Sequence, residues 1–261
     1  MKKIKQRLQN GETLHGCWLN MGSSLSAEMV GKSDFDWVLV DLEHGAGNEQ
    51  DALHQFQALE HGSAAAITRI ESVSRPRVHR MLDMGAEGIM FPQIRTVEEA
   101  REAIAAMRYA PDGVRGTAIY VRATNYGKQL DEYYQGVKDN LLGVIQIETL
   151  ESLKNLEGIA TIDGVDVLFI GPADLTMGMG IFWQFDHPQY QEALKATAAA
   201  AEKAGKAAGV LMADPAQYEM YYKLGFRFLA CGSDATFVNK GAATMAAQLH
   251  QSRTQLEQSK E

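Results

Sequence analysis

Val144-Ile-Gln-Ile-Glu148 and Val167-Leu-Phe-Ile-Gly-Pro-Ala-Asp174 are two apolar runs that each deliver a carboxylate where the run ends. Short continuous apolar runs are typical of strands that are buried on both faces of a parallel sheet. In parallel α/β folds, ligands and catalytic groups collect at the carboxyl ends of the strands. Two carboxylates at such ends suit a hard divalent cation that keeps positions open for water and substrate. The two runs therefore predict a parallel α/β fold and a metal-dependent enzyme.

Six further apolar runs alternate with helical stretches along the chain, so that eight strands are expected. The eight runs cover residues 15–19, 37–42, 65–70, 88–92, 144–147, 167–170, 209–212 and 226–230. Eight βα units in 261 residues favour one domain over 1–261, a closed (β/α)8 TIM barrel, for which about 250 residues are typical. A doubly wound open sheet is the structural alternative, but no G-x-G-x-x-G follows the first run.

Capping signals mark the helices between these runs. Thr96-Val-Glu-Glu99 has the pattern of a capping box, and Asp214-Pro215 has that of an N-cap followed by the first helical residue. The longest connection without clear periodicity covers residues 109–140. We expect it to be an active-site or subunit-contact loop that is inserted after the fourth strand.

Composition argues against several classes of protein. The chain is 46% hydrophobic, yet no run approaches the roughly 20 apolar residues of a membrane span. Residues 1–8 are basic, but no apolar stretch follows them, so we do not expect a secretion signal. The net charge of −8, without a basic tract, argues against nucleic acid as a partner. Cys17 and Cys231 lie in apolar runs without a C-x-x-C motif, which predicts buried reduced thiols in a cytoplasmic protein.

Two further strand ends carry groups that could act on a substrate. The run 37–42 leads into Asp41-Leu-Glu-His44, and the run 65–70 carries Arg69 near its end. An imidazole titrates near neutral pH, and a neighbouring carboxylate can hold its tautomer, so His44 is predicted to be a catalytic acid or base. A guanidinium at a barrel rim can bind a carboxylate or stabilise an oxyanion. For Arg69, an ion pair with Glu43 or Glu71 is an equal alternative.

Glu148 and Asp174 have a simpler alternative when each is taken alone. Acidic residues are common in the first turn of a helix, where they complement the helix dipole. Two of them at the ends of adjacent strands favour a metal site instead. The Gly171-Pro172 pair fixes a turn that exposes the backbone N–H groups of Ala173 and Asp174, which would form a cradle for a ligand carboxylate.

Together these motifs resemble the HpcH/HpaI family of class II aldolases, which act on 4-hydroxy-2-oxo acids such as 4-hydroxy-2-oxoheptanedioate, or on 2-keto-3-deoxy sugar acids. The resemblance rests on Asp41-x-Glu-His44, Arg69, Gln146-Ile-Glu148 and Gly171-Pro-Ala-Asp-Leu175, in this order, and covers nearly the whole chain. It implies a barrel of the phosphoenolpyruvate/pyruvate type. It also implies a homohexamer in which the last helix is exchanged between subunits.

The resemblance also implies a mechanism. Glu148 and Asp174 would hold Mg²⁺ or Mn²⁺, with Co²⁺ as a further candidate, and the metal would chelate the 2-oxo acid. Cleavage of the carbon–carbon bond would then leave a metal-bound pyruvate enolate, whose charge Arg69 would stabilise. His44, oriented by Asp41, would take the proton of the 4-hydroxyl group.

Other residues would bind the substrate if the resemblance holds. Gln146 would position a water, and the N–H groups of Ala173 and Asp174 would hold the pyruvate carboxylate. Leu211 would pack near the pyruvate methyl group. The predicted site also includes Trp18, Glu43 and Asp83.

The chain departs from the family pattern after Asp174. Phe182, Trp183 and Phe185 stand where relatives tend to have a short glycine- and proline-containing stretch. These aromatic residues are expected to form a subunit interface, or alternatively an apolar wall for the aldehyde. Two other functions stay open, a lyase of the citrate-lyase-β or malyl-CoA type and a non-catalytic barrel. No lysine stands at a comparable end of the fifth to seventh strands, which argues against Schiff-base chemistry.

Overall fold

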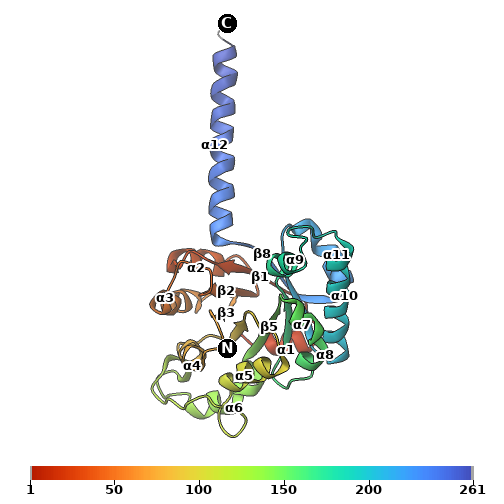
Figure 1. Cartoon of the computed structure of the whole chain (residues 1–261). Helices are drawn as coiled ribbons and strands as arrows, with labels where there is room; N and C mark the ends of the chain where they lie inside the picture. The colour runs from red at the N-terminus through yellow and green to blue at the C-terminus, as the bar shows by residue number, and fades with distance from the viewer. Residues whose placement is uncertain (1, 260–261) are drawn as a thin grey trace.

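The computed structural model describes residues 2–259, in which eight parallel strands close into a barrel in the order β1 to β8 (Figure 1). Closure comes from the pairing of β1 with β8, in which Gly16 lies opposite Ala230. The strands are β1 (Leu14–Leu19), β2 (Trp37–Asp41), β3 (Ala65–Arg69), β4 (Gly88–Phe91), β5 (Leu142–Ile147), β6 (Val167–Ile170), β7 (Ala207–Met212) and β8 (Phe226–Ser233). The predicted (β/α)8 barrel is confirmed, with the largest extension in β8, which continues to Ser233.

Most of the helices follow a strand and lie around the outside of the barrel (Figure 1). They are α1 (Ile4–Gln9), α2 (Ser24–Gly31), α3 (Glu49–Leu59), α4 (Arg75–Asp83), α5 (Val97–Met107), α6 (Leu130–Asn140), α7 (Leu150–Lys154), α8 (Leu156–Ala160), α9 (Pro172–Gly178), α10 (Pro188–Lys203), α11 (Tyr218–Lys223) and α12 (Asp234–Gln258). The predicted capping box is confirmed, because Thr96 and Glu99 bind each other's backbone N–H at the start of α5. Asp214 caps a 3₁₀ turn, η2 (Pro215–Gln217), and α11 begins only after that turn.

The hydrophobic core has an inner and an outer layer. Side chains from alternate strand positions fill the barrel, where Trp37 stacks on Phe228 with ring centroids 4.0 Å apart and meets Phe169 edge-on at 6.4 Å. The outer layer packs the helices against the strands. Because side chains fill the interior of the barrel, a ligand cannot bind inside it and has to bind at one of its ends.

Residues 109–140 are not a loop throughout, because they contain η1 (Arg122–Thr124) and α6. Helix α6 contacts α1 and η1 and leads into the first residues of β5. The segment therefore reaches the end of the barrel where β5 begins. Arg122 in this segment binds Met84 and Glu60 at the C-terminal ends of α4 and α3, and a role at the active site or in subunit contact stays a prediction.

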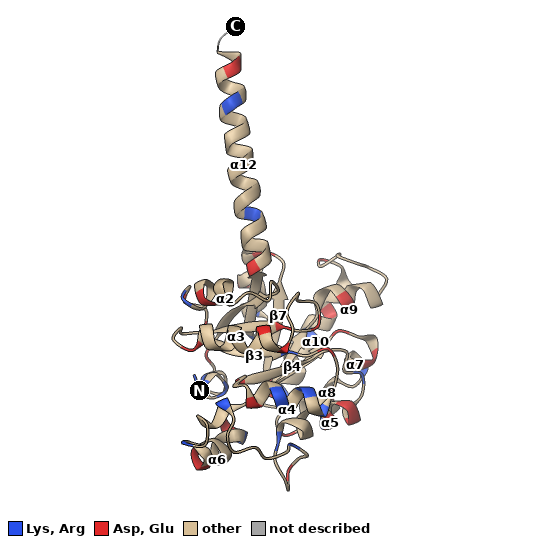
Figure 2. Cartoon of the chain, turned by 90° about the vertical axis from the view of Figure 1, so that its left-hand side faces the viewer, with Lys and Arg blue, Asp and Glu red and all other residues tan. Residues whose placement is uncertain are grey.

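Helix α12 projects away from the barrel and carries few charged residues (Figures 1 and 2). Its described residues are exposed apart from Asp234 at its start. Among residues 2–259, no helix combines the length and the apolar composition that crossing a membrane would require.

Substituting Gly16 by alanine should destabilise the barrel. A Cβ atom at this position would overlap with the ring of Trp37, which is fully buried and held by its aromatic neighbours. We expect Gly16→Ala to lower the free energy of unfolding by about 1–3 kcal/mol, as overpacking usually does, measured by urea denaturation. Gly241→Ala is the matched control. A Cβ there would meet no atom within 4 Å, so this helix substitution should leave stability unchanged or raise it.

Candidate active site

The predicted site residues gather where the strands end, at the carboxyl end of the barrel. Asp41 and Arg69 are the last residues of β2 and β3 and lie opposite each other in the strand register. Glu148 follows β5 directly, and Asp174 lies in the first turn of α9, which follows β6. Since β2 and β3 are neighbours, as are β5 and β6, the site consists of two pairs of adjacent strands.

Asp41 and Arg69 form a buried bidentate ion pair. Arg69 Nε donates to Asp41 Oδ1 over 2.9 Å, and Arg69 Nη2 donates to Oδ2 over 2.7 Å. Nη1 of Arg69 lies 3.0 Å from Oε2 of Glu43. Glu71 pairs with Arg77 instead. Of the two ion-pair alternatives for Arg69, the structure contains the one with Glu43, and the guanidinium is held from two sides at the barrel rim.

Glu148 is a buried carboxylate with two glutamine partners. Its Oε1 accepts the backbone N–H of Gln93 over 2.6 Å, and its Oε2 accepts the side-chain amide of Gln146 over 2.9 Å. Burial raises the pKa of Glu148 to about 7, the N–H of Gln93 opposes this increase, and the carboxylates of Asp174 and Glu43 add to it. Negative charge is therefore concentrated around a carboxylate that is itself removed from water, whereas Asp174 is exposed.

The residues present fit a divalent cation. Cations such as Mg²⁺ bind proteins through one or two carboxylates and keep several water or substrate ligands, and Glu148 with Asp174 supplies that donor set. Oε1 of Gln146 is buried without a partner among the described residues. Gly171 leaves space beside Glu148, because a Cβ there would lie 2.5 Å from Oε2 of Glu148. Among residues 2–259, no three His, Cys, Asp or Glu side chains lie close enough together to hold a metal ion. Water or substrate would therefore have to complete the coordination of an ion held by Glu148 and Asp174.

The imidazole of His44 is held less tightly than we expected. Both oxygens of Asp41 are engaged by Arg69, and Oδ1 also accepts the backbone N–H groups of Glu43 and His44, over 3.1 and 3.3 Å. Asp41 therefore orients the backbone at His44 and not its ring. The ring itself is 70% exposed, with Nε2 3.9 Å from Oε2 of Glu43.

The other predicted binding residues fall into two groups. Ala173 and Asp174 are the second and third residues of α9, where backbone N–H groups have no partner within the helix. Trp18 and Leu211 belong to the inner layer of the barrel core, with Trp18 5.6 Å from Phe169 between ring centroids.

Asp83 is not brought to this site. It is the last residue of α4, which leads to the beginning of β4, and its Oδ1 accepts a hydrogen bond from Arg115 over 2.7 Å. That arginine is fully buried against the rings of Tyr109 and Tyr133. Asp83 therefore stabilises the packing at the opposite end of its own barrel.

The aromatic segment after α9 is exposed. Phe182 and Trp183 are 51% and 59% exposed, and Trp183 adopts a left-handed backbone conformation with φ of 64°. The ring of Trp183 lies 5.0 Å from that of Phe185. Both the interface and the aldehyde-wall interpretations stay predictions.

Sequence reasoning missed two polar residues at the site. Gln93 follows β4 and binds Glu148 with both its backbone and its side chain. Asn20 follows β1, and its side-chain amide donates to Oδ2 of Asp41 over 2.8 Å. Both stand within two residues of a strand end, and this position was the signal that could have identified them.

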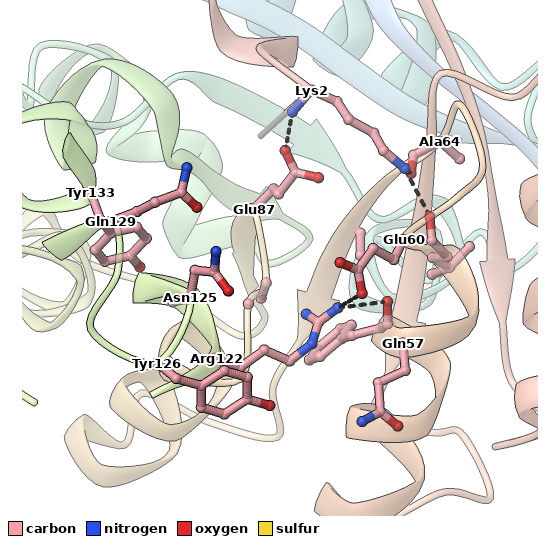
Figure 3. Close-up of a pocket in the computed structure, with 16 residues that line it drawn as sticks. Lys2, Gln57, Glu60, Ala64, Glu87, Arg122, Asn125, Tyr126, Gln129 and Tyr133 are labelled. Atoms are coloured by element: carbon pink, nitrogen blue, oxygen red, sulfur yellow. Dashed lines mark hydrogen bonds and ion pairs between the residues drawn. The ribbon is translucent and has the colours of Figure 1, made fainter. Parts of the chain in front are cut away.

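A separate cavity of about 420 Å³ lies away from these residues, near the beginnings of β3 and β4 (Figure 3). Its charged groups pair with each other or with backbone carbonyls. The backbone N–H of Lys2 donates to Glu87, and Arg122 donates to Glu60 over 2.8 Å. With its charges already paired, this cavity offers no reacting group.

The buried carboxylate of Glu148 should make the metal-free protein less stable as the pH rises. Its pKa is raised from an ordinary 4.5 to about 7, so between these values the folded state holds the proton more tightly than the unfolded state. Stability is therefore lost as the pH rises through this window. In EDTA, Glu148→Gln should unfold at a higher temperature than wild type at pH 8, with a smaller difference at pH 5. The exposed Glu98→Gln is the control, and a gain that does not depend on pH would contradict this prediction.

Comparison with known proteins identifies the family of the chain. Residues 14–240 match the family described as HpcH/HpaI aldolase/citrate lyase. A 4-hydroxy-2-oxo-heptane-1,7-dioate aldolase of Salmonella arizonae is 36% identical over 244 residues, which cover 94% of this chain and 93% of the relative.

Two solved structures share the fold over almost their full length. A HpcH/HpaI aldolase/citrate lyase family protein from Burkholderia cenocepacia superimposes with a TM-score of 0.91 at 32% identity, covering 96% of this chain and 100% of that one. A HpcH/HpaI aldolase from Desulfitobacterium hafniense gives a TM-score of 0.88 at 27% identity, covering 94% of this chain and 96% of that one. The chain therefore belongs to the HpcH/HpaI aldolase/citrate lyase family, as its motifs predicted.

Proposed function

We propose that the protein is a divalent-metal-dependent aldolase that reversibly cleaves a 4-hydroxy-2-oxo acid into pyruvate and an aldehyde. The observation that carries this proposal is the Asp41–Arg69 pair at the same barrel rim as the carboxylates of Glu148 and Asp174. This rim would therefore combine the fixed guanidinium of Arg69 with a bound metal ion. The relative named 4-hydroxy-2-oxo-heptane-1,7-dioate aldolase, which matches over nearly the whole chain, supports a dicarboxylic substrate of that type.

Binding and charge stabilisation come from groups that the fold holds in place. The N–H groups of Ala173 and Asp174 would hold the carboxylate of the 2-oxo acid. Arg69 would donate to the keto oxygen and stabilise the negative charge that develops there, because its guanidinium is already oriented by Asp41 and Glu43.

Proton transfer would fall to His44. Its exposed imidazole takes the proton of the 4-hydroxyl group, and the bond between C3 and C4 breaks. The released electron pair forms the enolate of pyruvate, and the former C4 leaves as an aldehyde. Transfer of a proton from water to C3 of the enolate then completes pyruvate. In the synthetic direction the imidazolium returns its proton to the alkoxide that forms.

Glu148 and Asp174 would hold the cation, Mg²⁺, Mn²⁺ or Co²⁺, and a bound cation would polarise the keto group as a Lewis acid. Gln146 would orient a water through its amide, whose oxygen has no partner among the described residues.

We also propose that the protein is a cytoplasmic homohexamer. Val238, Met245, Leu249 and Leu256 recur on one face of α12, and each is 58–65% exposed. An apolar stripe of this length on a projecting helix favours coverage by another subunit. The two free cysteines suit a reducing compartment.

The proposed activity predicts release of pyruvate, measured with a coupled lactate dehydrogenase assay on 4-hydroxy-2-oxo acids. His44→Ala and Arg69→Ala should each lower kcat about 100-fold or more, because a base and an oxyanion donor usually contribute this much. His54→Ala and Arg77→Ala, which replace the same residue types outside the site, are the matched controls. EDTA should abolish the activity, and Mg²⁺ or Mn²⁺ should restore it. Full activity after chelation, or cleavage of a CoA ester but of no 2-oxo acid, would contradict the proposal.

The proposed assembly predicts that a charge on the α12 stripe breaks it. Leu249→Glu should shift the mass measured by light scattering from six chains to a smaller species, since a carboxylate cannot be buried in an apolar contact without a partner. Gln248→Glu adds the same charge one residue away and should leave the assembly intact. A wild-type chain that is monomeric at micromolar concentration would contradict the hexamer.

A further inference from the structure

Asn20 connects three parts of the molecule through its three polar groups. Its backbone N–H donates to Oδ1 of Asp234, its side-chain amide donates to Oδ2 of Asp41, and its carbonyl oxygen accepts the N–H of Ala46, each over 2.8 Å. Asp234 belongs to α12, Asp41 orients Arg69, and Ala46 lies in the loop that carries His44. Asn20 therefore contacts the C-terminal helix, the carboxylate that orients Arg69, and the loop that carries His44.

Asp234 does more than begin α12. The residue is 2% exposed, and its carboxylate accepts hydrogen bonds from the loop after β1 and from the first turn of α2. Besides Asn20, the N–H of Met21 donates to it over 3.4 Å and the hydroxyl of Ser26 over 2.7 Å. A buried carboxylate needs such donors, and here they fix the position of the loop that contains Asn20 relative to the base of α12.

The side chain of Asn20 completes the set of donors around Asp41. Oδ2 of Asp41 accepts from Asn20 and from Nη2 of Arg69, and Oδ1 accepts from Nε of Arg69 and from two backbone N–H groups. The side chain of Asp41 has no exposed surface, so water cannot replace a lost donor without rearrangement. Removing the Asn20 amide would take away one of the two hydrogen bonds that Oδ2 of Asp41 accepts.

The loops after β1 and β2 are in direct backbone contact. A Cβ on Gly45 would lie 3.4 Å from the carbonyl oxygen of Asn20, and a Cβ on Gly22 would lie 2.7 Å from the Cα of Gly47. Because no side chain separates the two loops, a shift of the first loop displaces the second. The position of His44 thus depends on the loop that Asp234 holds.

We propose that Asn20 and Asp234 are positioning residues that hold Arg69 and the His44 loop in their reacting arrangement. The proposal rests on the function proposed above and extends it, because it makes the base of α12 part of the support of the site. The competing possibility is that both residues contribute to stability alone.

The first test compares two substitutions of Asn20. Asn20→Ala removes the donor to Asp41, and we expect kcat/KM for cleavage of the 2-oxo acid to fall about tenfold, which is the size of one lost charge-assisted hydrogen bond. Asn20→Asp keeps the shape but places a second carboxylate against Asp41, so its loss should be larger, about 100-fold. A role in stability alone predicts that both variants unfold at a lower temperature while kcat/KM of the folded enzyme stays unchanged. Asn155→Ala, which removes an amide with two backbone partners on the α7–α8 connection, is the control and should keep full activity.

The second test asks whether Asp234 acts through Asn20. Asp234→Asn should lower kcat/KM about tenfold in the wild-type background and by a smaller factor in the Asn20→Ala background, because the contact from the Asn20 side chain to Asp41 is already lost there while the backbone link to the His44 loop remains. Asp166→Asn is the matched control, since Asp166 accepts the N–H of Gly143 and pairs with Lys5 at the start of β5. It should lower the unfolding temperature without changing kcat/KM.

A third measurement does not depend on the activity. Hydrogen exchange followed by mass spectrometry should be faster at the amides of residues 43–46 in Asn20→Ala, Asn20→Asp and Asp234→Asn, and unchanged there in Asp166→Asn. If the wild type cleaves no 2-oxo acid, the proposed function fails, and the exchange rates still decide the structural link. The proposal would be overturned by unchanged exchange at residues 43–46. It would also be overturned by an Asn20→Asp variant as active as Asn20→Ala, or by losses of kcat/KM that are additive in the double variant of Asn20 and Asp234.

Discussion

The buried ion pair between Asp41 and Arg69 is the interaction on which the candidate site depends. Two parallel hydrogen bonds fix the plane of the guanidinium, and Glu43 holds it from the other side. A buried pair of this kind contributes little to net stability, because both charges lose their hydration. Its value here is geometric. It places a permanent positive charge at the barrel rim. The side chain of Arg69 is already ordered before a substrate binds, so binding does not have to order it.

The barrel interior provides the rigidity that this pair requires. The stacked rings of Trp37 and Phe228 fill the interior together with Phe169, so the strand ends above them are supported from below. A packed interior resists deformation. The interior therefore supports a buried carboxylate at the strand ends, where burial above all, and the nearby carboxylates of Asp174 and Glu43 in addition, raise the pKa of Glu148.

Some parts of the site could be predicted from the sequence and others could not. Glu148 and Arg69 stand at strand ends, and the apolar runs before them mark those ends clearly. Asp83 was assigned to the site although it ends a helix, and a helix in this fold leads back to the opposite end of the barrel. Asn20 was missed because its role comes from partners more than 20 positions away in the chain, which no local pattern reveals.

The sequence by itself determined the eight-stranded barrel, the family, and the strand ends that carry the acidic and basic groups, because apolar periodicity and short motifs are local properties. Only the tertiary structure decided how these groups are paired. It assigned both oxygens of Asp41 to Arg69, Asn20 and the backbone, left the ring of His44 exposed, and joined the base of α12 to the loop after β1. Pairing depends on distances between strands that are far apart in the chain, and these distances exist only once the barrel has closed.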